Sequence, residues 1–336
     1  MVNFTPNRLE EIQKSFTGKR IAVVGDLMLD RYFWGKVSRI SPEAPVPVVE
    51  VEEESTRLGG AANVANNIAS LGGVPIMIGI VGNDAGGDSL RKLVAEKGFP
   101  TDGIITDKSR PTTIKTRVIA HNQHVVRIDH EEKIDLNADV ETQVIACFER
   151  QIQSLDGIIL EDYNKGVLTQ GLIASLIRLA KEHKKTITVD PKFNHFFEYK
   201  GVSVFKPNRK ETEEAFGRRM DVFQDIEEAA HELVSRLNAD NELLTMGEKG
   251  MLLLERNGAL AHVETKARHV ADVSGAGDTV IATLTMAMVA GASIGEAAAI
   301  ANYAGGIVCG EAGIVPIDKD VLIQTILKDI NQGGAR

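Results

Sequence analysis

A run of small residues followed by a carboxylate is the pattern in this sequence that best suits phosphate chemistry. Residues 272–279 read Asp-Val-Ser-Gly-Ala-Gly-Asp-Thr and lead into an apolar segment that is predicted to be a buried helix. The first N–H groups of a helix lack intrahelical partners and lie at the positive end of its dipole, so they attract anions. Gly275 and Gly277 have no Cβ to keep a phosphate away from the backbone. Asp278 suits a base that takes a proton from a hydroxyl attacking phosphorus.

The alternative interpretation of 272–279 is an ordinary Gly-rich loop whose Asp caps a helix. Two absent motifs bear on the choice. The sequence contains no G-x-x-x-x-G-K-[ST], and no G-x-G-x-x-G follows its first predicted strand. A P-loop kinase and a dinucleotide-dependent oxidoreductase are therefore disfavoured. If the chain uses ATP, residues 275–278 are the candidate phosphate-binding segment.

A second small-residue segment precedes another predicted helix. Gly59 and Gly60 open the segment 59–71, and Asn63 follows one turn later. Two glycines allow a polyol ring to approach the backbone, while a carboxamide both donates to and accepts from hydroxyls. Tight packing of a helix on a sheet explains the same glycines equally well.

The elements that must position these residues alternate along the chain. Apolar runs at 21–24, 74–81, 156–160, 186–190, 202–205, 242–246 and 250–255 predict strands, and segments 84–97, 138–153, 169–183 and 221–237 predict helices. This alternation indicates a mostly parallel sheet covered by helices on both faces. Ligands bind such sheets at the C-terminal ends of the strands, where we expect six polar residues: Asp26, Asp30, Asp162, Asp190, Asn208 and Thr245.

Two further segments, at about 31–57 and 110–130, predict a small sheet outside the main one. Valines alternate with three prolines in the first segment, and proline confines strands to sheet edges. We interpret the pair of segments as a β-sheet lid over the ligand crevice. Exposed strand edges with apolar valines would be adhesive, so a homodimer through the lid is expected.

Composition limits the function classes. The chain of 336 residues is 43% hydrophobic and 25% charged, as is usual for a soluble globular protein. Its formal net charge of −9 argues against a nucleic-acid partner. It has no signal-peptide core and no apolar run of membrane-spanning length, and its two cysteines are expected to be free thiols. We therefore expect a cytoplasmic protein with no membrane partner.

Taken together, the two small-residue segments resemble a known family. Residues 59–82 resemble the first signature of the PfkB (ribokinase-like) carbohydrate kinases, and residues 272–278 resemble the second. The resemblance extends from Ile21 to about Pro316. It implies a single PfkB-type kinase domain over 1–336, with a ribokinase-like three-layer α/β fold, a mostly parallel central sheet and a small β-sheet lid. It also implies ATP-dependent phosphorylation of a sugar or nucleoside hydroxyl, with Mg²⁺.

Four segments resemble one branch of that family more closely. Residues 30–35, 38–47, 162–166 and 189–192 are similar to those of the D-glycero-D-manno-heptose 7-phosphate kinases of ADP-heptose (lipopolysaccharide core) biosynthesis. Many of those proteins continue into a nucleotidyltransferase domain with an H-x-G-H motif, which this sequence does not contain. The resemblance implies a kinase-only version acting on a sugar phosphate. Another PfkB substrate, or a non-catalytic sugar-binding relative, stays open.

The resemblance also implies roles for individual residues on the nucleotide side. Asp278 matches the catalytic base, and the N–H groups of Gly275, Ala276 and Gly277 match the anion hole for the transferred phosphoryl group. Asn208 and Glu211 match an N-x-x-E motif that organises Mg²⁺, and the rival interpretation is a helix cap with Glu at the third position. The nucleotide itself would lie near Thr245, Gly247, Gly250 and Asn302.

On the sugar side the resemblance implies hydroxyl contacts from Asp30, Gly59, Gly60 and Asn63, with Asp162 near the same crevice. A sugar phosphate also needs fixed cations, for which arginine is best suited. The candidates for that grip are Arg39, Lys165, Lys192, Arg117 and Arg127, each of which is alternatively a solvated surface charge.

Overall fold

The structure is a computed structural model, and it describes residues 5–121, 123–266, 270–311 and 313–333. Its large sheet is built from β1 (Arg20–Gly25), β4 (Val74–Val81), β5 (Ile104–Thr106), β8 (Gly157–Glu161), β9 (Thr186–Asp190), β10 (Val204–Phe205), β11 (Asn241–Thr245), β12 (Met251–Glu255) and β13 (Leu260–Val263). Their order is β13-β12-β11-β10-β9-β8-β1-β4-β5, and the strands from β11 to β5 are parallel. The mostly parallel central sheet predicted from the sequence is confirmed, and β11–β12 and β12–β13 are its antiparallel pairs.

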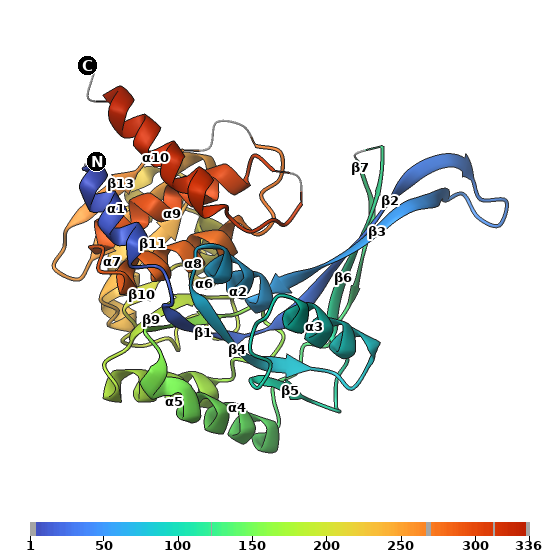
Figure 1. Ribbon diagram of the computed structural model, residues 1–336, viewed down its shortest axis with the longest axis horizontal. Coiled ribbons are helices and arrows are strands. Elements are labelled where there is room, and N and C mark those ends of the chain that lie inside the picture. Colours follow the sequence, from blue (N-terminus) through green and yellow to red (C-terminus); the bar gives the residue numbers. More distant parts are fainter. Residues whose placement is uncertain (1–4, 122, 267–269, 312, 334–336) are drawn as a thin grey trace.

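Helices cover both faces of this sheet, as Figure 1 shows. They are α1 (Pro6–Lys14), α2 (Ala61–Ser70), α3 (Ala85–Glu96), α4 (Ala138–Gln151), α5 (Gln170–Glu182), α6 (Arg209–Phe216), α7 (Phe223–Leu237), α8 (Ala276–Val289), α9 (Ile294–Val308) and α10 (Lys319–Gly333), with 3₁₀ turns η1 (Ile152–Ser154) and η2 (Gly247–Lys249). Within the described ranges, no helix is long and apolar enough to cross a membrane.

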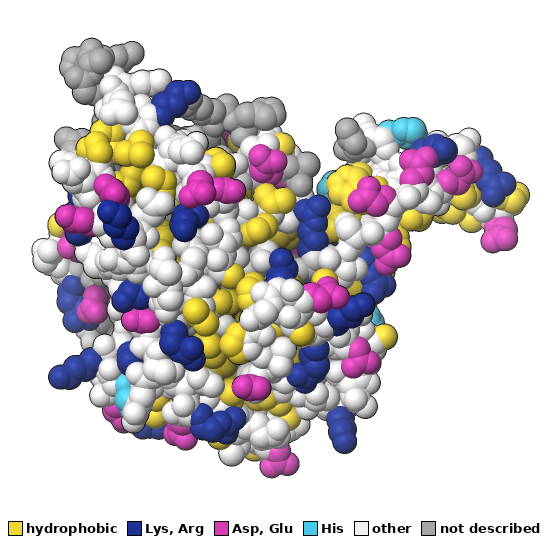
Figure 2. Space-filling view, viewed as in Figure 1, with side chains coloured by type: hydrophobic (Ala, Val, Ile, Leu, Met, Phe, Trp, Pro, Cys, Tyr) yellow, Lys and Arg dark blue, Asp and Glu magenta, His cyan; other side chains and the backbone are white. Residues whose placement is uncertain are grey.

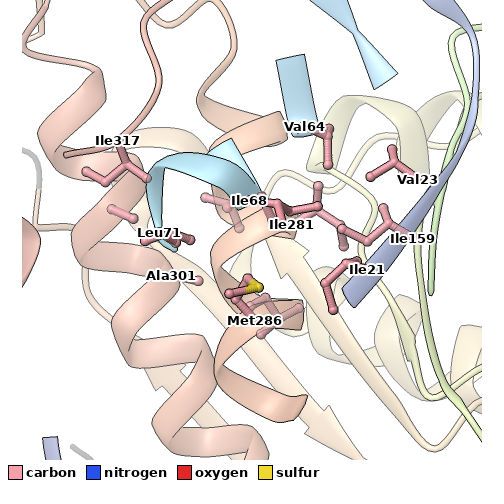
Figure 3. Packing of buried hydrophobic residues seen from close by; sticks show 14 of the residues in the cluster. Ile21, Val23, Val64, Ile68, Leu71, Ile159, Ile281, Met286, Ala301 and Ile317 are labelled. Carbon is pink, nitrogen blue, oxygen red and sulfur yellow. The ribbon is translucent and has the colours of Figure 1, made fainter. Parts of the chain in front are cut away.

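Strand β1 shows why the chain forms three layers. Its side chains alternate, so Ile21 and Val23 face one apolar cluster whereas Ala22 and Val24 face another. The first cluster is formed with α2, α8 and α9, and Figure 3 shows Ile68 and Ile281 packed beside β1. The second is formed with α4 and α5. A strand that is apolar on both faces is typical of a buried parallel sheet.

A second, small sheet has the order β3-β2-β6-β7. Its strands are β2 (Leu27–Ile40), β3 (Pro47–Gly60), β6 (Thr113–Ala120) and β7 (Gln123–His130). The outer part of the β2–β3 ribbon projects from the body in Figure 1, and Figure 2 shows yellow apolar atoms along the projecting arm. The exposed apolar side chains of this sheet include Ile40, Val51, Val126 and Ile128, and Val46 is exposed in the loop between β2 and β3.

Some predicted boundaries differ from the structure. The predicted strand 202–205 is only Val204–Phe205. At Ser203 the backbone N–H donates to the Ile187 carbonyl, but the Ile187 N–H donates to the Ser203 hydroxyl and not to a backbone carbonyl. The helix predicted from residue 59 begins at Ala61, since Gly59 and Gly60 still belong to β3 and pair with Met28 and Leu27. Helix α6, which no predicted segment covered, begins at the Asn208 cap.

Candidate active site

Helix α8 begins at the edge of a cleft of about 690 Å³. Gly275 is its N-cap, with φ of +79°, a conformation that side-chain-bearing residues rarely adopt. Gly275, Ala276, Gly277 and Asp278 all line the cleft, so the four residues predicted for phosphoryl transfer lie together. The positive end of the α8 dipole therefore lies beside a space large enough for a nucleotide, while the Ala276 N–H donates to the Val273 carbonyl across 3.3 Å.

Asp278 is held by a donor on each carboxylate oxygen. Asn63 Nδ2 donates to its Oδ2 across 2.7 Å, and the Tyr163 hydroxyl donates to its Oδ1 across 2.6 Å. The side chain is buried, with 3% of its residue surface exposed. Burial raises the pKa of Asp278 to about 6, although both hydrogen bonds favour the ionised form and lower the pKa. Asp278 is thus a carboxylate poised to titrate just below neutral pH.

Asn63 and Tyr163 reach Asp278 from opposite parts of the chain. Asn63 lies in the first turn of α2, and Tyr163 lies in the loop after β8. The backbone N–H of Tyr163 donates to buried Asp26 across 2.7 Å, as does that of Lys165 across 3.1 Å. Sequence reasoning placed Asn63 near the sugar but gave no role to Tyr163, whose signals were its position after a buried strand and within the segment 162–166.

The predicted sugar residues gather at the junction of the two sheets. Asp30 on β2 pairs with Arg57 on β3, and its carboxylate is ion-paired with Arg117 of β6. A Cβ on Gly59 would overlap Oδ2 of Asp30, so a glycine is required beside this carboxylate. Gly60 is the N-cap of α2 and immediately precedes the turn that carries Asn63.

Asp162 is held by two donors, from Tyr199 and Asn164, that do not line the cleft. Its oxygens accept from the Tyr199 hydroxyl across 2.8 Å and from the Asn164 N–H across 2.8 Å. Asp162 does not line the cleft, whereas the adjacent Tyr163 does. Because side chains on neighbouring residues of an extended chain point to opposite sides, sequence alone left open which residue faces the ligand.

The residues predicted for the nucleotide lie along the same cleft. Its lining includes Asn208, Thr245, Gly247, Gly250 and Asn302. Asn208 and Thr245 are joined by a parallel bridge between neighbouring chain segments. The Asn302 carboxamide donates to the backbone carbonyl of Glu264 across 2.6 Å, which ties α9 to the segment after β13.

Asn208 and Glu211 form a complete capping box. Asn208 Oδ1 accepts from the Glu211 N–H across 2.9 Å, and Glu211 Oε2 accepts from the Asn208 N–H across 2.8 Å. The remaining Glu211 oxygen is ion-paired with Lys192. The helix-cap interpretation of this pair is therefore present in the structure. Glu211 itself is not among the residues that line the cleft, and both of its oxygens already have donors.

A buried ion pair that the sequence did not predict stands beside the helix start. Lys206 Nζ lies 2.8 Å from Asp190 Oδ2, and both side chains are almost fully buried. A Cβ on Gly277 would be 3.5 Å from that carboxylate and 3.8 Å from the ammonium. Both residues line the cleft, so Lys206 places a fixed positive charge next to the anion-binding turn.

Glu161 adds a second unusual carboxylate under the site. It ends β8, it is buried, and its Oε2 has no hydrogen-bond partner within the described ranges. Burial, together with the negative charges of Asp190 and Asp278, raises the pKa of Glu161 well above its usual range. When Glu161 is protonated, it adds no negative charge beside Asp278, so it does not oppose ionisation of Asp278.

Most of the predicted phosphate-gripping cations already have carboxylate partners. Lys165 is 2.8 Å from Glu131, Arg127 is 3.0 Å from Asp129, and Arg117 and Lys192 pair with Asp30 and Glu211. Arg39 is exposed on the outer part of β2.

A buried carboxylate beside an anion-binding helix start, in a cleft at the C-terminal edge of a three-layer α/β fold, defines a phosphotransferase of the sugar-kinase class. The chain belongs to the pfkB family of carbohydrate kinases, because the family model matches residues 19–319. The resemblance deduced from residues 59–82 and 272–278 is thereby confirmed, and so is the expectation of a sugar kinase.

Curated relatives are similar over most of this chain. It is 44% identical over 295 residues to the bifunctional protein HldE of Helicobacter pylori strain J99, which covers 88% of this chain and 64% of that protein. It is 42% identical over 304 residues to HldE of Desulfatibacillum aliphaticivorans, covering 90% of this chain and 62% of that protein. The chain thus spans somewhat less than two thirds of the length of these relatives.

Solved structures share the fold. Phosphofructokinase-2 of Escherichia coli in complex with potassium superposes with a TM-score of 0.75 at 21% identity, covering 94% of this chain and 99% of that one. Ribokinase of Arabidopsis thaliana complexed with ribose and ATP superposes with a TM-score of 0.71 at 18% identity, covering 92% and 99%. The predicted ribokinase-like architecture is confirmed.

Proposed function

We propose that this chain transfers the γ-phosphate of ATP to the anomeric 1-hydroxyl of D-glycero-D-manno-heptose 7-phosphate, giving the 1,7-bisphosphate for ADP-heptose synthesis. The observation that carries the phosphotransfer is buried Asp278, held between Asn63 and Tyr163 at the N-terminus of α8. The heptose assignment is supported by the likeness of residues 30–47 and 162–166 to the heptose 7-phosphate kinases, and by the similarity to HldE proteins.

Asp278 acts as the general base in this proposal. With a pKa raised only to about 6, it is ionised at neutral pH and still basic enough to accept a proton. The 1-hydroxyl gives its proton to Asp278 while its oxygen bonds to the γ-phosphorus, and the bond from that phosphorus to the β-phosphate oxygen breaks. ADP leaves with the electron pair of that bond.

Asn63 has a second task on the sugar side. Its Nδ2 holds Asp278, whereas its buried Oδ1 has no partner within the described residues. A buried acceptor without a donor is costly, so a sugar hydroxyl is a fitting partner for it. Asp30 on β2, and the backbone of Gly59 and Gly60 at the end of β3, supply the further hydroxyl contacts we propose.

The transferred phosphoryl group is stabilised by fixed donors and charge. In the proposal the N–H groups of Gly275, Ala276 and Gly277 face its oxygens, and Lys206 supplies a positive charge behind Gly277. A mostly dissociative transition state carries spread negative charge, which such preorganised groups stabilise. ATP would occupy the rest of the cleft, from Asn208 to Asn302.

We propose that magnesium enters this site together with the nucleotide. Within the described ranges there is no group of three or more His, Cys, Asp and Glu side chains that could hold a metal. Asn208 and Glu211 are engaged in their capping box, so we propose that they hold Mg²⁺ largely through its waters. The ion would neutralise charge on the β- and γ-phosphates.

We also propose that the small sheet acts as a lid over the sugar, that its edges form a homodimer contact, and that the enzyme works in the cytoplasm. The support for the dimer is the row of exposed apolar residues on the outer strands, including Val51, Val126 and Ile128. Light scattering of the purified protein tests it, and a monomeric mass at micromolar concentration would exclude this contact.

A coupled assay of ADP release over a panel of sugars tests the substrate. Heptose 7-phosphate should give a kcat/KM at least about 100-fold above ribose, fructose and fructose 6-phosphate, because a phosphate and several hydroxyls are recognised together. Phosphorus NMR should assign the new phosphate to C1. Comparable rates on all of the sugars would remove the heptose assignment while leaving the kinase intact.

A further inference from the structure

The lid contains a lysine that stands apart from the other cations of the site. Lys115 of β6 is half-buried, and it forms no ion pair with a carboxylate in the described part of the chain, unlike Arg117 two residues later, which pairs with Asp30. Burying an ammonium group without an anion is unfavourable. Its ammonium group lies over the Tyr163 ring, which attracts a cation without neutralising it, so an anion is still a favourable partner.

The surroundings of Lys115 make the local charge positive. Burial lowers the pKa of Lys115, and the nearby charge of Lys165 lowers it further, while Asp30, Glu131 and Asp129 act in the opposite direction. Asp129 lies opposite Lys115 in the β6–β7 register and is ion-paired with Arg127. Glu131 already accepts from Lys165 across 2.8 Å and lies 3.5 Å from Lys133. Asp30 is neutralised by Arg117. Two ammonium groups that repel each other at a half-buried position favour an anion beside them.

The distance from the catalytic base also fits. Lys115 Nζ lies 5.3 Å from the centre of the Tyr163 ring, and the hydroxyl at the end of that ring is 2.6 Å from Asp278. One tyrosine side chain thus separates Lys115 from the carboxylate that takes the proton. If a sugar lies along the Tyr163 ring with its reacting hydroxyl at Asp278, the opposite end of the sugar lies near Lys115.

We propose that Lys115, with Lys165 beside it, binds the phosphate that the sugar substrate already carries, at the end opposite the reacting hydroxyl. The proposal rests on the proposed sugar-phosphate kinase and names the residues that select its phosphorylated substrate. When Lys165 binds the phosphate in place of Glu131, Lys133 remains the ion-pair partner of Glu131. Arg39 and Arg127, both on exposed parts of the small sheet, have no part in this contact.

Kinetics of Lys115→Met test the proposal. A charge-assisted contact to a phosphate is strong, so KM for heptose 7-phosphate should rise by about tenfold to 100-fold while kcat changes by less than about threefold. The matched control is Lys36→Met, which removes an exposed lysine of the same sheet that pairs with Glu52. It should behave as wild type. Lys115→Arg should recover most of the affinity.

Unphosphorylated heptose separates phosphate binding from a structural role. Its kcat/KM, low in the wild type, should be unchanged by Lys115→Met. An equal loss on both sugars would mean that Lys115 only supports the small sheet, and an unchanged KM for heptose 7-phosphate would overturn the proposal outright.

A binding measurement keeps this test separate from the identity of the sugar. Inorganic phosphate is titrated calorimetrically into protein whose nucleotide cleft is saturated with a non-hydrolysable ATP analogue. Wild type and Lys36→Met should bind it, and Lys115→Met should bind it at least about tenfold more weakly. If heptose 7-phosphate is not a substrate but this difference is found, the substrate assignment fails and the phosphate site stands. Equal phosphate binding by all three proteins would refute the site.

Discussion

The hydroxyl of Tyr163 donates a hydrogen bond across 2.6 Å to Oδ1 of Asp278, and so joins the loop after β8 to the first turn of α8. That loop is itself fixed, because Asp26 accepts from the backbone N–H groups of Tyr163, Lys165 and Val167. With Asn63 on the other oxygen, the carboxylate has one orientation and a tuned pKa. The site is therefore preorganised for its base before any ligand binds.

Asp278→Asn should remove turnover and keep binding. The amide has nearly the shape of the carboxylate and can still accept a hydrogen bond, but it cannot take up the proton, so kcat should fall by about 10²- to 10⁴-fold. Calorimetry should give an ATP affinity within about threefold of wild type. Asp88→Asn, an exposed carboxylate in the first turn of α3, is the control and should be fully active. Near-normal kcat in Asp278→Asn would reject the base.

The rate should fall on the acid side of about pH 6. Burial raises the pKa of Asp278 from 3.8 to about 6, and only the ionised form accepts a proton. Below that pH, kcat/KM should drop by about tenfold per pH unit, and it should be level from pH 7 to 8. A profile measured at saturating ATP checks this. A level profile down to pH 5 would show that no group with this pKa controls the reaction.

The raised pKa of Asp278 also predicts how the free energy of unfolding changes with pH. Because the folded-state pKa of Asp278 lies above the unfolded value, the folded protein binds the proton more tightly, and its stability decreases as pH rises from about 4 to 6. Removing the titration in Asp278→Asn should therefore stabilise the protein at pH 7 by up to about 3 kcal/mol. The gain should vanish near pH 4. Urea unfolding at both pH values measures it, and a variant less stable than wild type at pH 7 would contradict the sign.

Tyr163→Phe should move the acid limb of the pH profile. Its hydroxyl favours the charged carboxylate, so losing it raises the pKa of Asp278 and shifts the limb to higher pH. The activity loss should be larger at pH 6.5 than at pH 8.5. Tyr199→Phe is the control, since it removes a hydroxyl bonded to Asp162, which does not line the cleft. An equal loss at every pH would assign Tyr163 a merely structural role.

Lys206→Met tests whether Lys206 contributes its positive charge to catalysis or only contributes to folding stability. Removing one partner of a buried ion pair leaves Asp190 uncompensated and should cost about 3–5 kcal/mol of folding stability. The double variant Asp190→Asn/Lys206→Met should regain much of that stability but not the rate, because the positive charge near the phosphoryl group is still missing. Recovery of both would show that Lys206 contributes only to folding.

The sequence by itself determined the local features of this protein. Apolar runs such as Ile21 to Val24 predicted parallel strands, since a strand buried on both faces must be apolar throughout. Gly275 to Asp278 predicted an anion-binding helix start, and the cap at Asn208 was among the weighed interpretations. Each of these patterns lies within about ten residues, where backbone geometry and side-chain period fix the outcome.

Only the tertiary structure decided which side chains meet. Asp278 is bonded to residues 215 and 115 positions away, Asn63 and Tyr163, and these pairings follow from strand order and register. Alternation along the chain made Tyr163, not Asp162, the residue that lines the cleft. Contacts between distant segments also decide which cations are paired. Arg117 pairs with Asp30 and Lys192 with Glu211, whereas Lys115 is left for the proposed ligand. Such contacts join distant segments, and no local spacing in the sequence encodes them.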